Sequence, residues 1–162
     1  MITHRRFKNT DAPEVAALVR TTMLTTNRHD YSRAYLENDL KTLTANDFIQ
    51  RALQFHCYVF LDSVTNHIIA VGAIGPYWGK TDESSLFNIF VHPSYQGQGI
   101  GRQLISVLEQ DDYFTRAHRI EIPASITALP FYQKMGYTFK DGIETPDEER
   151  LYRLEKFNHA SN

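Results

Sequence analysis

The hydrophobic positions near the start of the chain follow helical spacing. Four apolar side chains recur every three or four residues: Val15, Leu18, Val19 and Met23. Asp11, with Pro13 in the first turn and Glu14 three residues on, is typical of a helix start. The pattern predicts a first helix over residues 12–25. After a polar break, residues 32–53 repeat the spacing and predict one or two further helices.

From His56 onward the pattern is typical of strands. Cys57–Leu61 and Ile68–Ile74 are rich in β-branched and aromatic residues and flank a polar turn, which predicts a hairpin. A third such run, Leu86–Val91, ends at His92-Pro93. The remaining expected elements are a helix after the glycine cluster at 97–101, a strand at 119–122, a helix at 128–135 and one or two strands around 151–157. This order predicts an α/β sandwich with a mixed sheet, in a single domain spanning residues 1–162.

Composition narrows the function classes. The 162 residues are 42% hydrophobic and 22% charged, with a net charge of −2, so no general field attracts nucleic acid or a membrane. The single cysteine, Cys57, lies in an apolar run and predicts a buried residue without a disulfide. No stretch has the length and apolar character of a membrane span or signal peptide, so we expect a cytoplasmic protein. The histidines are scattered, so we expect no metal site.

A glycine-rich loop, Gln96-Gly97-Gln98-Gly99-Ile100-Gly101, joins the third expected strand to a helix. Glycines there let backbone N–H groups converge on an anion, and the helix N-terminus adds its dipole. A Rossmann loop would need a third glycine where Arg102 or Leu104 stands. A Walker A loop ending in Gly79-Lys80-Thr81 would need glycine in place of Ile74. The sequence therefore favours neither of these nucleotide loops.

The strand, the loop Gln-x-x-Gly-x-Gly and the following helix resemble the GNAT family of acetyl-CoA-dependent N-acetyltransferases without a gap. A second segment, Ala128-Leu129-Pro130-Phe131-Tyr132-Gln133-Lys134-Met135-Gly136-Tyr137, is similar to the family's A-x-x-F-Y-x-K-x-G-[FY]. The resemblance is specific between residues 86 and 137. It implies a mixed, mostly antiparallel sheet of about six to seven strands flanked by about four helices, splayed at the acetyl-CoA site.

The resemblance also implies a cofactor site. Backbone N–H groups of the loop would hold the pyrophosphate of acetyl-CoA, and the residues concerned are Gln96, Gly97, Gln98, Gly99, Ile100, Gly101 and Arg102. The backbone of Ile89, Phe90 and Val91 would pair with pantetheine, and the Val91 N–H would polarise the thioester carbonyl. Many members have Asn where this chain has Ser125, so that contact falls to a hydroxyl or is absent.

For catalysis, the resemblance assigns Tyr132 as the acid that protonates the departing thiolate. The general base is open. The family's carboxylate aligns with Ser85, whereas Glu83, on the same face of an extended strand, could act directly or through water.

The acceptor is left open by the sequence. Residues 26–55 and 75–85 are expected to form its walls, and the aromatic candidates there are Tyr31, Tyr35, Tyr77 and Trp78. The same segments carry Asp30, Glu37, Asp39, Asp82 and Glu83, which favour a cationic small-molecule amine. A protein N-terminus or lysine remains an alternative, and a homodimer is common among the proteins that the chain resembles. The rival function is a non-catalytic acyl-CoA-binding or sensing module, which would keep the loop and dispense with Tyr132.

Overall fold

The computed structural model describes residues 1–158 and contains two compact units. The first unit comprises Met1–Ala73 and Asn88–Ser106, and the second comprises Ile74–Phe87 and the chain from Val107 onward. The single domain over 1–162 stays a prediction, and its last four residues lie outside the described part.

The strands of the described residues form a seven-stranded sheet in the order β1-β2-β3-β4-β5-β7-β6. Their bounds are β1 Ile2–Arg6, β2 His56–Asp62, β3 Ile68–Pro76, β4 Glu83–Val91, β5 Arg119–Ala124, β6 Thr138–Phe139 and β7 Tyr152–Phe157. β4 and β5 are parallel, whereas the β1–β2, β5–β7 and β6–β7 pairs are antiparallel. The mixed, mostly antiparallel sheet predicted from the sequence is confirmed.

The described α-helices are α1 Ala12–Thr26, α2 Arg33–Leu40, α3 Ala45–Arg51, α4 Ile100–Leu108, α5 Asp112–Thr115 and α6 Leu129–Lys134. The segment 32–53 forms two helices, one of the two outcomes that the periodicity allowed. The single turn of α5 was not expected, because four residues are too few to display a helical period.

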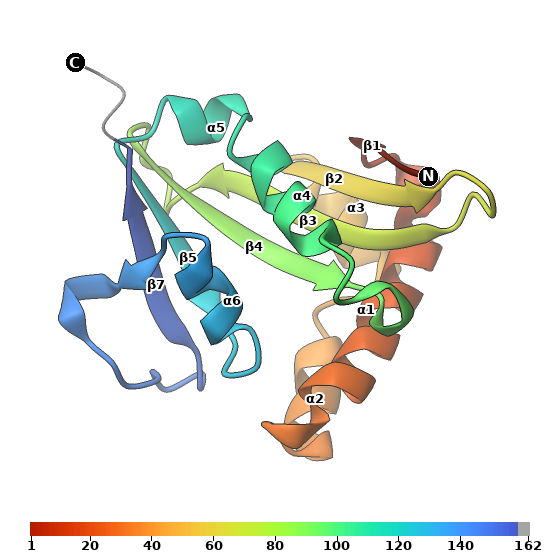
Figure 1. Ribbon diagram of the computed structural model, residues 1–162, viewed down its shortest axis with the longest axis horizontal. Coiled ribbons are helices and arrows are strands. Elements are labelled where there is room, and N and C mark those ends of the chain that lie inside the picture. The colour runs from red at the N-terminus through yellow and green to blue at the C-terminus, as the bar shows by residue number, and fades with distance from the viewer. Residues whose placement is uncertain (159–162) are drawn as a thin grey trace. The chain divides into compact units, whose positions relative to one another are not determined.

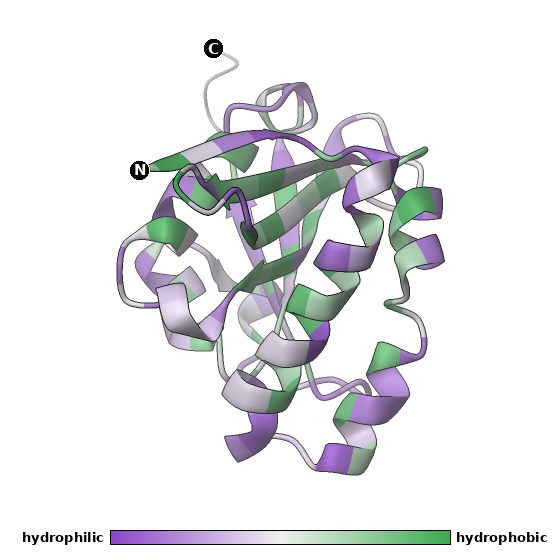
Figure 2. Ribbon diagram, turned by 90° about the vertical axis from the view of Figure 1, so that its right-hand side faces the viewer, coloured by the Kyte–Doolittle hydropathy of each residue, from purple (hydrophilic) through white to green (hydrophobic). Residues whose placement is uncertain are grey.

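In the first unit, α1 forms because its apolar stripe can be buried. Val15, Leu18 and Val19 are all buried, and α1 packs against α2 and α3 (Figure 1). Figure 2 shows long hydrophobic runs along the strands, whereas the helices carry both hydrophobic and hydrophilic residues. On α4, Leu104 lies so close to β3 that a Cβ on Gly72 would be 3.0 Å from its side chain. The apolar periodicity of α1 and α4 therefore marks the faces on which these helices pack.

The first unit also contains a strand that hydropathy did not indicate. β1 pairs antiparallel with β2 from Ile2↔Asp62 to Arg6↔Tyr58, although its sequence is mostly polar. It lies at one end of the strand order, where one backbone edge has no strand partner and polar side chains are favoured. Such a strand has too little apolar alternation to be predicted.

The helix start predicted at Asp11 is confirmed, because Asp11 is the N-cap residue of α1. The Asp11 carboxylate does not cap α1; it accepts hydrogen bonds from Arg5 Nη1 at 2.7 Å, Arg5 Nη2 at 2.9 Å and the Lys8 N–H at 2.8 Å. Glu14 does not bond back to the cap either, because its Oε2 accepts from the Ile68 N–H at 2.8 Å. The Asp11 carboxylate thus joins Arg5 of β1 and Lys8 to the start of α1, and Glu14 joins α1 to the start of β3.

In the second unit, β5 and β7 pair over six residues and both contribute core residues. Ile120, Ile122 and Leu154 are fully buried. Tyr137, which ends the second sequence motif, is buried as well, and its hydroxyl donates to Glu109 Oε2 at 2.9 Å.

The Arg5–Asp11 pair makes the stability of the protein depend on pH. The Arg5 guanidinium holds the pKa of the Asp11 carboxyl below its usual range. The contribution of the ionised Asp11 carboxylate to stability is therefore present above the unfolded-state pKa of about 4, and it is lost as the pH falls through the lower folded-state pKa. We expect Asp11→Asn to lower the free energy of unfolding by about 2 kcal/mol at pH 7, and by progressively less in acid.

Urea unfolding of the wild type and Asp11→Asn at several pH values measures this difference. Glu148→Gln, which removes an exposed carboxylate, is the matched control and should change stability little. A difference between wild type and Asp11→Asn that did not shrink in acid would refute the assigned role.

Candidate functional site

Strand β4 changes character along its length. Ser84 and Leu86 near its start are fully buried, but the apolar Ile89, Phe90 and Val91 at its end are all partly exposed. β5 pairs with β4 over Glu83–Ser85, and the register goes no further. A central strand is normally buried on both faces, so the end of β4 offers apolar surface and backbone groups that β5 does not use.

The end of β4 leads into a loop whose shape is fixed by side chains of the same segment. His92 Nδ1 accepts a hydrogen bond from the Ser94 N–H at 3.0 Å, so this histidine caps the turn. The Gln96 side-chain amide donates to the Val91 carbonyl and to Thr26 Oγ1, both at 3.0 Å. The Gln96 N–H faces Pro93 O at 3.4 Å, so this N–H closes the turn. The side chain of Gln96 therefore holds the loop in place.

The glycines of the loop adopt conformations that other residues rarely take. Gly97 has φ 77° and Gly99 has φ 82°, and open space surrounds the position that a Cβ would occupy on either residue. The Gln103 N–H bonds to the Gly99 carbonyl, which makes this the first turn of α4. The N–H groups of a first helical turn have no intrahelical acceptor. Together with the exposed Arg102, they give an anion-binding arrangement.

Tyr132 lies in α6, whose start is held by Ser125. The Ser125 hydroxyl oxygen accepts from the Ala128 N–H at 3.1 Å and its carbonyl accepts from the Leu129 N–H at 3.0 Å. Tyr132 is 6% exposed, and burial raises its pKa, so its hydroxyl is protonated at neutral pH. Unlike the hydroxyl of Tyr137, which bonds Glu109, it has no hydrogen-bond partner among the described residues. A protonated hydroxyl without a hydrogen-bond partner is suited to donate a proton.

Glu83 lies in a charged cluster that the sequence analysis did not anticipate. Its Oε1 accepts from Arg119 Nη1 at 3.0 Å, and its Oε2 lies 3.5 Å from Lys80 Nζ. Arg119 also bonds Glu121 and Glu155. If Glu83 acts as a base, the proton that it accepts must therefore compete with Arg119 and Lys80 for its carboxylate.

Ser85 and Glu121 occupy equivalent positions on neighbouring strands, since the β4–β5 register pairs them. Glu121 is only 1% exposed, and Lys140 Nζ lies 3.0 Å from its Oε1. The guanidinium of Arg119 lies 5.4 Å from the centroid of the Tyr77 ring, so this aromatic residue covers the cluster. The alternation Arg119-Ile120-Glu121-Ile122 was the available signal: charges at every second position of a strand core indicate a buried ion-pair network.

The other aromatic candidates have different environments. Tyr31 is buried and stacks on Tyr35 with ring centroids 4.8 Å apart, so it contributes to packing. Trp78 is 86% exposed in the loop between β3 and β4. Cys57 is buried, which raises the pKa of its thiol to about 12 and confirms it as a core residue.

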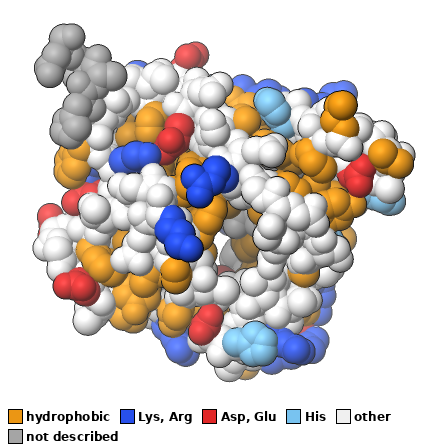
Figure 3. All heavy atoms as spheres, in the orientation of Figure 1, with side chains coloured by type: hydrophobic (Ala, Val, Ile, Leu, Met, Phe, Trp, Pro, Cys, Tyr) orange, Lys and Arg blue, Asp and Glu red, His pale blue; other side chains and the backbone are white. Residues whose placement is uncertain are grey.

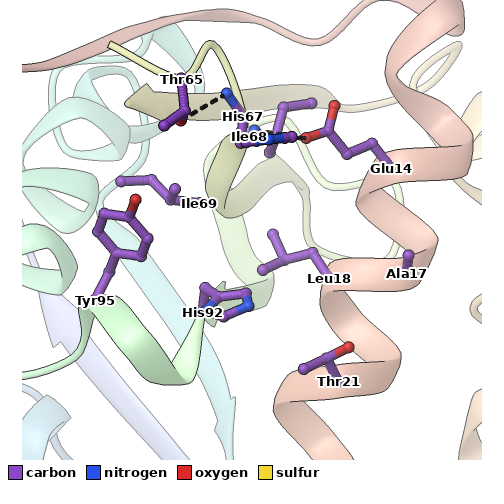
Figure 4. A pocket seen from close by; sticks show the side chains of 10 residues that line it. All are labelled: Glu14, Ala17, Leu18, Thr21, Thr65, His67, Ile68, Ile69, His92 and Tyr95. Atoms are coloured by element: carbon purple, nitrogen blue, oxygen red, sulfur yellow. Dashed lines mark hydrogen bonds and ion pairs between the residues drawn. The ribbon is translucent and has the colours of Figure 1, made fainter. Parts of the chain in front are cut away.

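A surface pocket of about 300 Å³ lies in the first unit between α1, the β2–β3 hairpin and the segment after β4 (Figure 4). Glu14, Ile68 and Tyr95 are among its lining residues, and the Glu14 carboxylate is already bonded to the Ile68 N–H. None of the site residues predicted from the sequence lines it. The pocket nevertheless borders the candidate cofactor segment, because His92 and Tyr95 line it and lie between Val91 and Gln96.

On the face drawn in Figure 3, Lys and Arg side chains are interspersed with Asp and Glu. Within residues 1–158, no group of three or more His, Cys, Asp or Glu side chains is arranged to hold a metal ion. Among the described helices, none has the length and apolar character needed to cross a membrane.

Comparison with known proteins identifies the fold and the family of the chain. A search of curated proteins found no match. The fold is similar to that of PaiA N-acetyltransferase from Thermoplasma acidophilum in complex with coenzyme A, with a TM-score of 0.82, 16% identity and coverage of 98% of this chain and 99% of that one. A GCN5-related N-acetyltransferase from Rhodopseudomonas palustris gives a TM-score of 0.77 at 20% identity over 96% and 95% of the two chains.

The ribosomal-protein-S18-alanine N-acetyltransferase from Escherichia coli shares the fold with a TM-score of 0.64, at 18% identity over 96% of this chain and 91% of that one. The family model described as the acetyltransferase (GNAT) family matches residues 22–137. Since this match spans most of the chain and contains both sequence motifs, the protein belongs to the GNAT acetyltransferase family.

Proposed function

We propose that the protein transfers the acetyl group of acetyl-CoA to a primary amine by direct attack in a ternary complex. The observation that carries the proposal is the end of β4, where Ile89–Val91 are half-exposed and unpaired with β5 and lead straight into the loop of Gly97 and Gly99. Acetyl-CoA presents an amide-containing pantetheine arm followed by a pyrophosphate. The two features follow each other along the chain in the order that such a ligand needs.

In the proposed complex, the N–H groups of the loop and of the first turn of α4 bind the pyrophosphate. The backbone of Ile89–Val91 pairs with the pantetheine amides, as a strand edge pairs with an extended peptide. The Val91 carbonyl already accepts from Gln96, so its N–H is the group we assign to the thioester carbonyl oxygen. Ser125 can donate its hydroxyl hydrogen to pantetheine, because only its oxygen is used by α6.

The chemical step forms a C–N bond and breaks a C–S bond. The attacking amine must first lose a proton, since an alkyl ammonium has a pKa near about 10 and no lone pair. We assign that proton to Glu83, directly or through water, once the cationic substrate weakens its contacts with Arg119 and Lys80. Ser85 is then a neighbour on the same strand face that can orient the water. Tyr132 gives its proton to the departing thiolate.

The acceptor we favour is a small molecule. Among the acids that suggested a cationic acceptor, Glu37 already pairs with Arg20 and Arg33, so it adds little attraction. Tyr77 and the exposed Trp78 next to the Glu83 cluster are the better candidates for contacts with the acceptor.

Gly99→Glu tests the cofactor site. A side chain at φ 82° strains the loop, and a carboxylate there repels the pyrophosphate, so we expect acetyl-CoA binding to weaken by about 100-fold or more in calorimetric titration. Gly142→Glu is the matched control, because Gly142 also has a positive φ of 71° and open space around it. It should bind like the wild type. Equal binding by Gly99→Glu and the wild type would exclude this loop as the pyrophosphate site.

Tyr132→Phe tests catalysis. Thiol release from acetyl-CoA, followed across a panel of primary amines, should fall by about 100-fold or more while acetyl-CoA still binds. Tyr137→Phe is the control, since it removes a hydroxyl that bonds Glu109; it should cost about 1 kcal/mol of stability and leave the rate within a few fold. A wild type that binds acetyl-CoA but releases no thiol with any amine would favour the non-catalytic module.

A further inference from the structure

Strand β4 leaves the regular strand conformation at Asn88. This residue has φ 53°, in the left-handed region that residues other than glycine rarely enter, although asparagine tolerates it better than most. A single left-handed residue inside a strand makes a bulge and changes which way the following groups point. The change from the buried Leu86 to the half-exposed Ile89–Val91 occurs at this residue.

The side chain of Asn88 is held from another element of the first unit. Arg51, the last residue of α3, donates from Nη1 to Asn88 Oδ1 at 2.7 Å. Its Nη2 donates to the Thr42 carbonyl at 3.0 Å, in the turn between α2 and α3. Because the guanidinium is planar and rigid, the anchor at Thr42 fixes the direction of the bond to Asn88.

We infer that Arg51 is a positioning residue for acetyl-CoA, which holds Asn88 in its left-handed conformation and so keeps the backbone of Ile89–Val91 facing the cofactor. The part of this inference that concerns acetyl-CoA rests on the proposed function, whereas the clamp on Asn88 does not. Without Arg51, Asn88 can relax to a negative φ. Since side chains and backbone groups alternate with a period of two, such a change redirects every group that follows.

The inference predicts that glycine at position 88 makes Arg51 dispensable, because glycine adopts a positive φ without a clamp. Four proteins test this: the wild type, Arg51→Met, Asn88→Gly and the double variant. Calorimetry measures acetyl-CoA affinity, and hydrogen exchange of the amides of residues 89–91 in the ligand-free protein measures the order of the strand. We expect Arg51→Met to weaken acetyl-CoA binding by about tenfold and to speed hydrogen exchange at residues 89–91. When Asn88→Gly is already present, Arg51→Met should change the affinity and the exchange rate by no more than about threefold.

Arg20→Met is the matched control. Arg20 also bridges two elements with a bidentate contact, to Glu37 at 3.1 and 2.9 Å, but it does not touch β4. Arg20→Met should leave the affinity for acetyl-CoA and the hydrogen exchange of the amides of residues 89–91 unchanged. If Arg51→Met does not fold, Arg51→Lys replaces it, because lysine keeps the charge but cannot bond Asn88 and Thr42 through one planar group.

Equal losses from Arg51→Met with and without Asn88→Gly would overturn the inference, since Arg51 would then act only by packing α3. A wild type that does not bind acetyl-CoA would refute the proposed function instead. The exchange measurement would still decide whether Arg51 holds the strand.

Discussion

The backbone between Asn88 and Gly99 is the constraint on which the candidate site depends. β4 begins as a central strand with Ser84 and Leu86 fully buried, and its pairing with β5 covers only its first three residues. Beyond the bulge at Asn88, the strand exposes apolar side chains and backbone edge, and within a few residues it enters the glycine loop. An open edge in the middle of a sheet is costly unless something pairs with it. A bound pantetheine arm would supply that pairing.

The two halves of the proposed proton transfer differ in how far the free protein prepares them. The Tyr132 hydroxyl is protonated, buried and without a partner among the described residues, so nothing must be displaced before it donates. Glu83, by contrast, is bound by Arg119 and Lys80 within a cluster whose charges largely balance. An ammonium substrate could compete for that carboxylate because it has the same charge as the groups it displaces. In the proposed mechanism, the acceptor thus helps to release the base that it needs.

Much of the fold could be predicted because its strongest signals are local. The stripe on α1 and the hairpin of β2 and β3 were predicted to within two residues at each end, since both bury continuous apolar faces. β1 was missed because an edge strand is polar, and α5 because one turn carries no period. The helix start at Asp11 was predicted, but its ion pair with Arg5 was not, because sequence spacing does not reveal a partner on another element.

The candidate site likewise has a part that local sequence patterns predicted and a part that they did not. The glycine loop and Tyr132 lie in contiguous motifs, so the family resemblance located them, and membership of the GNAT family is confirmed. Arg119 and its three carboxylate partners come from β4, β5 and β7, and Arg51 reaches Asn88 from 37 residues away. Contacts of this kind depend on strand register and helix docking, which no local pattern specifies.

The central claim is that acetyl-CoA binds along the end of β4 and the glycine loop. The most direct test is to follow backbone amide resonances of the isotope-labelled wild-type protein during titration with acetyl-CoA. The account predicts saturable shifts concentrated at residues 89–91 and 97–102. An absence of shifts, or shifts confined to the pocket lined by Glu14 and Tyr95, would contradict it.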